Sequence, residues 1–201
     1  MEKTKIAVLV SGGGTNLQAL IDARGKVLQS GEIVLVVSTR SDAYALQRAA
    51  AAGIPAVTVQ RKGKSQQEFE RGLTEALSAA GAEMLVLAGF MSILSADFTS
   101  RWPERIINIH PSLIPSFCGK GFYGLHVHEA ALAYGVKVMG ATAHYVNEVP
   151  DGGKIILQKA VEVLPDDTPE TLQRRVMEQA EWVLLPQAAE MTARALAEKR
   201  N

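Results

Sequence analysis

Short apolar runs alternate with helix-like segments along the first half of this chain. The run from Ile6 to Val10 is rich in β-branched residues, and Leu17, Leu20 and Ile21 follow it at helical spacing. Similar strand patterns occur at 33–37, 57–59 and 84–88, with helix patterns at 42–52 and 67–80. Strands that alternate with helices form a mostly parallel, twisted sheet covered by helices on both faces. The sequence therefore predicts a Rossmann-like α/β fold.

The second half of the chain is less regular. A strand pattern at 105–110 is followed by a long loop at 111–124 that has no periodicity, and then by a short helix at 129–134. Strands are expected at 138–146 and 155–163, and the turn at 148–153 would let them pair antiparallel. An antiparallel addition to the parallel sheet is therefore predicted.

The last part of the chain is predicted to be helical. Thr168 and Pro169 suit the start of a helix that runs to about Leu185, where Pro186 would kink it or begin the final helix. No internal repeat or low-complexity linker divides the sequence. We expect one domain over 1–201, with a nucleotide-binding half at 1–100 and a more irregular half at 101–201.

The composition excludes several classes of protein. The formal net charge is zero and Lys and Arg form no stripe, so we expect no nucleic acid partner. The apolar run at 6–10 is too short for a signal peptide, and no stretch approaches the ~20 apolar residues that cross a bilayer. The single cysteine, Cys118, cannot form an internal disulfide. These features predict a soluble, cytoplasmic protein without a membrane partner.

The glycine-rich turn from Ser11 to Asn16 has the form of a phosphate-binding loop. Its backbone N–H groups can approach a phosphate, and the N-terminus of the next helix attracts anions. Leu17 replaces the third glycine of a dinucleotide loop, the second strand ends in 38–40 without an acidic residue, and the Lys-Ser/Thr end of a P-loop is absent. We expect a small phosphate monoester rather than NAD or ATP; the alternative is a tight turn without a ligand.

A pair of polar residues ends the strand at 105–110. Asn108 and His110 alternate with apolar residues, so both project from one face near the carboxyl end of the strand, where ligands bind in parallel sheets. An amide N–H and an imidazolium can stabilise the oxyanion of an acyl transfer, and a carboxylate would favour the charged ring. Asp151 is the candidate carboxylate. The alternative is a structural role, because buried polar groups need partners in any fold.

The remaining histidines and the cysteine are weaker candidates. His110, His126, His128 and His144 could be imagined around a zinc ion, but the Cys or carboxylate spacing of common zinc sites is absent. Packed or hydrogen-bonded roles are expected for His128 and His144, and no metal is expected. Cys118 lies in the long loop without an obvious base beside it, which gives little support to a nucleophilic role.

Five segments resemble the phosphoribosylglycinamide formyltransferases in order and spacing. The resemblance extends from Ile6 to about Pro186. The matching segments are Ser11-Gly-Gly-Gly-Thr-Asn-Leu-Gln18, Leu87-Ala-Gly-Phe-Met91, Ile107-Asn-Ile-His-Pro-Ser-Leu-Ile-Pro115, Gly124-Leu-His-Val-His128 and Asp151-Gly-Gly-Lys-Ile-Ile-Leu-Gln158. Any one of them is a weak match, whereas five together are specific.

The resemblance implies a role for each matching position. The implied catalytic residues are Asn108, His110 and Asp151. The implied ribonucleotide residues are Gly13, Gly14, Thr15, Asn16 and Glu181, although one extra residue lies between Arg175 and Glu181. The implied folate residues are Met91, Ser92, Ile93, Leu94 and Asn108. The resemblance thereby makes 101–201 the catalytic and folate-binding half.

The implied activity is a step of de novo purine biosynthesis. The formyl group of 10-formyltetrahydrofolate, a co-substrate, would pass to the amine of glycinamide ribonucleotide. Transfer would be direct, through a tetrahedral oxyanion that Asn108 and a charged His110 stabilise while Asp151 holds the ring charged. The resemblance also implies a homodimer as one form of assembly.

Some positions depart from the family pattern. Ser92 stands where members commonly have an arginine, no arginine occurs near Gln66 of the kind that contacts the folate tail, and the loop at 116–123 is longer than in many members. Rival readings are a formyltetrahydrofolate hydrolase and a methionyl-tRNA formyltransferase, both expected to carry an additional domain. A non-catalytic nucleotide-binding module is the third.

Overall fold

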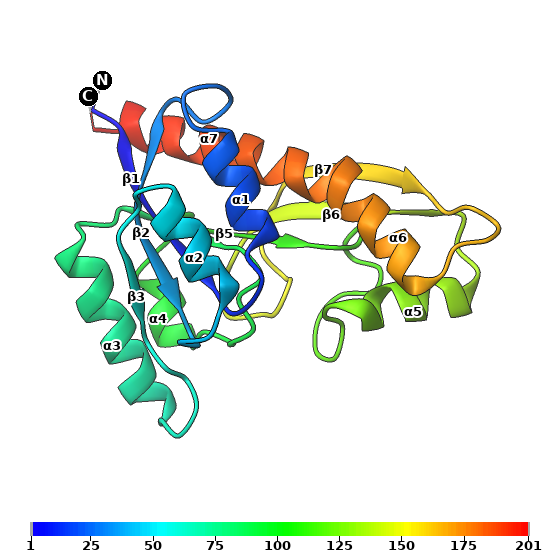
Figure 1. The fold of residues 1–201 in the computed structure, drawn as a ribbon, viewed down its shortest axis with the longest axis horizontal. Helices are drawn as coiled ribbons and strands as arrows, with labels where there is room; N and C mark the ends of the chain where they lie inside the picture. Colours follow the sequence, from blue (N-terminus) through cyan, green and yellow to red (C-terminus); the bar gives the residue numbers. More distant parts are fainter. Residues whose placement is uncertain (1, 201) are drawn as a thin grey trace.

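A seven-stranded sheet organises the computed structural model, which describes residues 2–200 (Figure 1). The strand order is β3-β2-β1-β4-β5-β6-β7. The strands are β1 (Thr4–Val10), β2 (Gly31–Ser38), β3 (Ala56–Thr58), β4 (Met84–Leu87), β5 (Ile106–His110), β6 (Val138–Tyr145) and β7 (Ile155–Glu162). Strands β1 to β5 are parallel, whereas β6 pairs antiparallel with both β5 and β7. The predicted fold class is confirmed.

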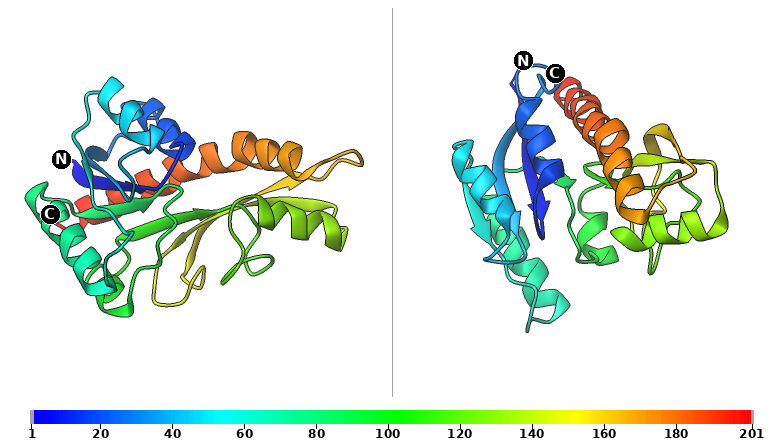
Figure 2. Two further views of the ribbon diagram at one scale, coloured as in Figure 1. Left: turned by 60° about the horizontal axis from the view of Figure 1, so that its bottom comes forward. Right: turned by 45° about the vertical axis from the view of Figure 1, so that its right-hand side comes forward.

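Helices cover both faces of the sheet, because its strands are apolar on both sides. Along β1, Ile6 and Val8 belong to one buried cluster, whereas Ala7 and Leu9 belong to another. The first cluster includes α1 (Thr15–Asp22), α2 (Tyr44–Ala51), α5 (Leu125–Tyr134), α6 (Pro169–Val176) and α7 (Trp182–Glu198). The second includes α3 (Gln66–Ala79) and α4 (Ala96–Ser100), which lie across the sheet from α1 and α2 (Figure 2).

The helix boundaries differ from the predictions in two places. Helix α4 was not predicted, because five residues are too few to show a period; the Ser95 hydroxyl caps it by accepting from the Phe98 N–H at 3.1 Å. Helix α5 begins at Leu125, directly after Gly124, and not at Glu129 as predicted.

The final helical segment contains a π turn. Helix α6 is followed by a π-helix at Met177–Glu181, and α7 continues from it with Pro186 inside. The final helix therefore begins at Trp182 and not at Pro186, as the sequence allowed. The extra residue noted between Arg175 and Glu181 falls in this turn. A π turn holds more residues per turn than an α-helix, so it absorbs an insertion without shifting the residues that follow.

Loops at the carboxyl ends of the parallel strands gather at one edge of the sheet. The Ser11 hydroxyl, after β1, accepts hydrogen bonds from the Met91 N–H at 3.0 Å and from the Thr39 hydroxyl at 2.8 Å. The glycine-rich loop, the end of β2 and the loop after β4 are therefore tied together. Binding sites of open parallel sheets form at this edge.

Candidate active site

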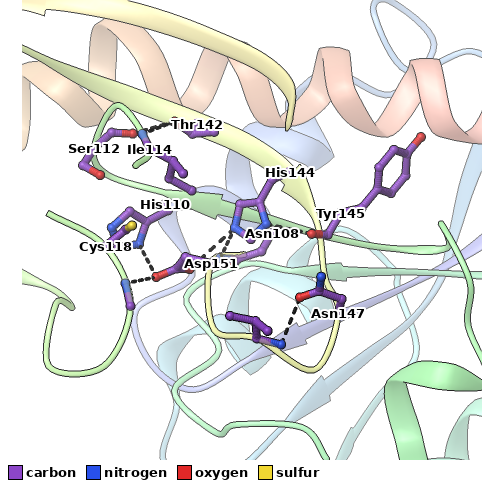
Figure 3. A network of polar contacts seen from close by, with 12 residues as sticks. Asn108, His110, Ser112, Ile114, Cys118, Thr142, His144, Tyr145, Asn147 and Asp151 are labelled. Atoms are coloured by element: carbon purple, nitrogen blue, oxygen red, sulfur yellow. Dashed lines mark hydrogen bonds and ion pairs between the residues drawn. The ribbon is translucent and has the colours of Figure 1, made fainter. Parts of the chain in front are cut away.

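Asn108 and His144 face each other across the β5–β6 pair. They are register partners, and Asn108 Nδ2 lies 3.2 Å from His144 Nε2 (Figure 3). In the tautomer that carries its proton on Nδ1, His144 donates to the Tyr145 carbonyl at 2.8 Å and presents its Nε2 lone pair to the Asn108 amide. His144 thus orients the side chain of Asn108 and leaves its second amide N–H for another acceptor.

Asp151 lies between two imidazole rings. Its Oδ2 is 3.4 Å from His110 Nδ1 and its Oδ1 is 3.6 Å from His144 Nε2. The Gly119 N–H donates to Oδ2 at 2.8 Å, which ties the 111–124 loop to the carboxylate (Figure 3). The predicted proximity of Asp151 to His110 is present, and Asn108 joins them through His144.

The turn that carries Asp151 depends on its own backbone geometry. Asp151 has a φ of +54°, a left-handed conformation that Asp tolerates better than most residues. Gly153 lies two residues after Asp151. A Cβ at this position would lie 1.8 Å from the Tyr145 carbonyl oxygen. The close approach of these two backbones therefore requires glycine and fixes the turn against the end of β6.

Burial and charge compete at this cluster. Burial opposes ionisation of Asp151, but the nearby His144 ring, the charge of His110 and the hydrogen bond from the Gly119 N–H hold the pKa of Asp151 below its ordinary value. Burial lowers the pKa of His110, and Asp151 and the Phe117 carbonyl oppose this without reversing it. Asp151 therefore acts to raise the pKa of His110, as expected of a neighbouring carboxylate, while burial of the ring acts in the opposite direction and is the larger influence.

Both nitrogens of His110 nevertheless have acceptors. Besides Asp151 at Nδ1, the Phe117 carbonyl lies 2.9 Å from Nε2. A ring that faces two acceptors can donate to both only when it is protonated. The geometry therefore suits an imidazolium that forms when further negative charge develops nearby.

The loop that supplies the Phe117 carbonyl is anchored by Thr142, the register partner of His110. The Thr142 hydroxyl donates to the Ser112 carbonyl at 2.7 Å and accepts from the Ile114 N–H at 3.1 Å. Gln158 Nε2 donates to the same hydroxyl at 3.0 Å. These contacts fix the chain immediately after His110.

A hollow opens beside Asn108, His144 and Asp151, and we call it the active-site hollow. Its wall also contains Leu87, Phe90, Ser92, Ile93, Leu94, Val146, Asn147, Glu148, Val149 and Pro150. Four of the five predicted folate residues, Asn108 and Ser92 to Leu94, therefore line it. Met91 does not line the hollow, and it is 59% exposed. His110 is not part of this wall, and its ring lies on the other side of Asp151 from His144 (Figure 3).

The glycine-rich loop is shaped by close packing against α2. Gly14 has a φ of +73°, and a Cβ there would lie 2.7 Å from the Cβ of Ala45. Arg48 Nε donates to the Gly13 carbonyl at 2.9 Å. The N–H groups at the start of α1 thereby remain directed outward at the helix N-terminus, as phosphate binding requires.

Asn16 and Glu181 form a buried pair between α1 and the π turn. Asn16 Nδ2 donates to Glu181 Oε2 at 2.8 Å, and Asn16 Oδ1 has no partner among residues 2–200. Burial raises the pKa of Glu181 to about 7, and the Asn16 hydrogen bond opposes this. The pair brings two predicted ribonucleotide residues together from opposite ends of the chain.

A larger hollow lies elsewhere. It has a volume of about 510 Å³ and is lined by α1, α2 and α7, with Thr15, Trp182 and Pro186 among its residues. Thr15 is the one predicted site residue in it. Asn108, His144 and Asp151 line the smaller, active-site hollow. The candidate site is therefore identified by its polar side chains and not by the volume of the hollow.

The structure places an arginine in contact with Gln66. Arg61 Nη2 donates to Gln66 Oε1 at 3.1 Å, so an arginine does lie beside Gln66. Five positions separate them, and the β3–α3 loop folds back to join them. Sequence matching misses such a contact because it compares single positions.

The other histidines and the cysteine have separate surroundings. His126 is 60% exposed and pairs with Glu129, whereas His128 is buried and burial lowers its pKa to about 4. No group of three or more His, Cys, Asp or Glu suited to a metal ion occurs within 2–200. Burial raises the pKa of the Cys118 thiol, which disfavours the thiolate that a nucleophile needs. His144 is the functional candidate that its apolar strand pattern concealed.

No helix within 2–200 combines the length and apolar character needed to cross a bilayer.

Comparison with known proteins gives consistent matches. A family model described as formyl transferase matches residues 4–188. The phosphoribosylglycinamide formyltransferase of Haemophilus influenzae is 41% identical over 183 residues, which cover 90% of this chain and 84% of that protein. The crystal structure of glycinamide ribonucleotide transformylase 1 from Symbiobacterium toebii superposes with a TM-score of 0.88 at 41% identity, covering 96% of this chain and 89% of that one.

A longer relative matches as well. The trifunctional purine biosynthetic protein adenosine-3 of Drosophila melanogaster is 43% identical over 192 residues. The match covers 94% of this chain but only 14% of that protein.

Proposed function

The chain belongs to the formyl transferase family, among the phosphoribosylglycinamide formyltransferases, and from this we propose that it formylates glycinamide ribonucleotide. The formyl donor is 10-formyltetrahydrofolate, and the products are formylglycinamide ribonucleotide and tetrahydrofolate, in de novo purine biosynthesis. The observation that carries the proposal is the contact of Asn108, His144, Asp151 and His110 beside the active-site hollow.

Asn108 and His110 stabilise the tetrahedral intermediate. The neutral amine attacks the formyl carbon, and the C=O electron pair moves onto oxygen, where the free N–H of Asn108 donates to it. That negative charge adds to Asp151 and raises the proton affinity of His110, so the imidazolium forms as the transition state requires it. When the C–N bond to the folate breaks, the proton that the attacking amine loses passes through His110 to the leaving nitrogen.

The two substrates occupy neighbouring parts of the sheet edge. The phosphate of the ribonucleotide binds the N–H groups of Gly13 to Asn16, and Glu181 faces its glycinamide part. The folate pteridine enters the active-site hollow between 92–94 and 146–151. The Ser11–Met91 hydrogen bond, which joins the two loops, supports this arrangement. Holding both reactants in line supplies much of the rate enhancement.

The wider proposal concerns organisation and location. We treat 1–201 as one formyltransferase domain, with the phosphate loop in 1–100 and the catalytic residues in 101–201. The protein acts on small molecules and uses neither a metal nor a nucleic acid. It works in the cytoplasm, and we propose a homodimer as one form of its assembly. Balanced charge supports the absence of nucleic acid. An Arabidopsis thaliana relative is named as chloroplastic, so location is best tested by fractionation in the source cell.

A product assay tests the activity. Purified protein is mixed with glycinamide ribonucleotide and 10-formyltetrahydrofolate, and folate release is followed by absorbance while mass spectrometry identifies the product. Release that requires the ribonucleotide, with formylglycinamide ribonucleotide formed, supports the transferase. Equal release without it indicates a hydrolase, and ribonucleotide binding without release indicates a non-catalytic module.

The Asn108→Ala variant tests the oxyanion donor. Loss of one such donor lowers turnover by about 100-fold or more. We expect that loss with an unchanged thermal melting curve, because the removed amide is partly exposed at the hollow. Turnover within a few-fold of the unmodified protein would remove Asn108 from the mechanism.

A further inference from the structure

The larger hollow lies between α1 and α7, and we call it the α1–α7 groove. Its volume of about 510 Å³ is within the range of small-molecule sites. Helix α1 turns Ala19 and Ala23 toward it, one turn apart, and their single methyl groups leave space between the two helices. The other lining residues are Thr15, Gln18, Asp22, Lys26, Val27, Arg48, Trp182, Val183, Pro186 and Gln187.

The apolar side chains of the groove face solvent. Val27 is 46% exposed and Val183 is 37% exposed, so a ligand can reach both. Trp182 is half-buried in the same wall, and its indole N–H is buried without an acceptor among residues 2–200. An unpaired buried donor is destabilising. The wall therefore favours a flat, apolar ligand that also brings a hydrogen-bond acceptor.

One end of the groove carries a cation with unused donors. Arg48 Nε donates to the Gly13 carbonyl at 2.9 Å, and its Nη1 donates to Gln18 Oε1 at 3.1 Å. The guanidinium also lies over the ring of Tyr44, 5.0 Å from the centroid. Within residues 2–200 Arg48 forms no ion pair, and the two hydrogen bonds use two of its five N–H groups. A guanidinium held in this way is suited to a phosphate group.

The charged groups of the groove favour an anion of defined length. Arg48 and Lys26 are cations and Asp22 is an anion, so two positive charges and one negative charge leave one net positive charge. Asp22 Oδ1 accepts from Gln18 Nε2 at 2.9 Å, which leaves Oδ2 for a donor on a ligand. Thr15 and Asp22 lie two turns apart on α1, a rise of about 10 Å. This spacing is similar to the length of a nucleoside monophosphate.

We propose that the α1–α7 groove binds a nucleoside monophosphate whose base carries an amino group. The phosphate pairs with Arg48, the base lies against the apolar wall, and its amino group donates to Asp22. This site is separate from the active-site hollow, and binding involves no covalent step.

The occupied groove acts on the ribonucleotide loop, and this step rests on the proposed function. Arg48 holds the Gly13 carbonyl, and Trp182 directly follows Glu181, which accepts from Asn16. A phosphate on Arg48 draws the guanidinium from Gly13 and adds negative charge beside the loop. The nucleotide therefore weakens ribonucleotide binding. We expect KM for the ribonucleotide to rise at least about fivefold, the lower end of typical couplings between sites.

The fluorescence of Trp182 measures binding directly. The chain has two tryptophans, so Trp102→Phe leaves Trp182 as the single reporter. Adenosine monophosphate is the probe, whereas adenosine lacks the phosphate and ribose 5-phosphate lacks the base. We expect a saturable change with adenosine monophosphate and a much weaker response to either fragment. No response to the nucleotide, or a response that one fragment reproduces in full, would overturn the proposal.

A filled groove tests the location. Ala19→Leu places a larger side chain in the groove, and Ala76→Leu is the matched control at a half-buried position of α3, on the other face of the sheet. We expect the nucleotide response to be lost in Ala19→Leu alone. Val183→Glu is the second variant if Ala19→Leu does not fold, since it adds a repelling charge at an exposed position. A response retained in the folded variants would contradict the assignment.

Titration at increasing ribonucleotide concentrations separates the groove from the glycine-rich loop. For two coupled sites, the nucleotide affinity falls to a limit as the loop saturates. An affinity that falls without limit would place the nucleotide in the loop itself and overturn the proposal. Binding does not require turnover, so a fluorescence response without formyl transfer would count against the proposed function alone.

Discussion

Two imidazole rings share the carboxylate of Asp151, but they play different parts. His144 has its Nδ1 committed to the Tyr145 carbonyl, so its other nitrogen can orient Asn108. His110 has an acceptor at each nitrogen and lies behind the carboxylate, where it can take up a proton. The cluster is therefore a set of mutually oriented groups rather than three independent catalytic residues.

The His144→Ala variant tests this orientation. Without the ring, the Asn108 amide loses its partner and Asp151 loses one contact, so we expect kcat to fall by about tenfold, a loss of about 1.4 kcal/mol, with little change in either KM. His126→Ala is the control, since that ring is 60% exposed and pairs with Glu129 on the surface. An unchanged kcat in His144→Ala would show that Asn108 needs no help from β6.

At the scale of elements, the turn between β1 and α1 permits little variation. Its left-handed residue, Gly14, packs on Ala45 at the start of α2, so the loop and that helix approach more closely than a side chain would allow. The π turn before α7 is a second constraint, because it absorbs an added residue and still presents Glu181 to Asn16. Both features place backbone or polar groups at the sheet edge.

Gly14→Ala and Gly25→Ala form a matched pair for the first constraint. Both glycines have a similar positive φ, of +73° and +71°, but a Cβ at Gly25 meets nothing within 4 Å. We expect Gly25→Ala to cost about 1–2 kcal/mol of unfolding free energy from backbone strain, and Gly14→Ala to cost more because of the contact with Ala45. KM for the ribonucleotide should rise only in Gly14→Ala. Equal unfolding free energies in urea would show that the contact is absent.

At the scale of the whole molecule, the pair of Asn16 and Glu181 joins α1 to the helical segment near the end of the chain. The two residues are 165 positions apart and both are buried. A buried carboxyl group with a raised pKa is protonated in the folded chain at pH values where the unfolded chain has already released its proton. Its contribution to stability therefore falls as the pH rises from about 4.5 to about 7.

Glu181→Gln removes this dependence. The shift from 4.5 to about 7 corresponds to roughly 3 kcal/mol, so relative to the unmodified protein the variant should gain about that much more stability at pH 8 than at pH 5. Urea unfolding at the two pH values measures the difference. A constant difference between the two proteins across this range would mean that Glu181 titrates as an ordinary exposed acid.

The sequence by itself determined the α/β class, the antiparallel addition and the position of the candidate residues in the chain. Periodicity carried this information, because alternating burial on a strand and a 3.6-residue spacing on a helix are local properties. Asn108 and His110 could be placed on one face from their spacing alone. Helix α4 was missed, because five residues contain too little of a period to be recognised.

Only the tertiary structure decided how those residues act together. His144 joins Asn108 because β6 pairs antiparallel with β5, and Arg61 meets Gln66 because a loop folds back on itself. The balance at His110 was also beyond the sequence, since burial depends on every segment packed around the ring. The spacing of residues along the chain determines which side chains lie on the same face of a strand or helix. Contact distances, desolvation and coupling between charges arise only when distant segments pack together.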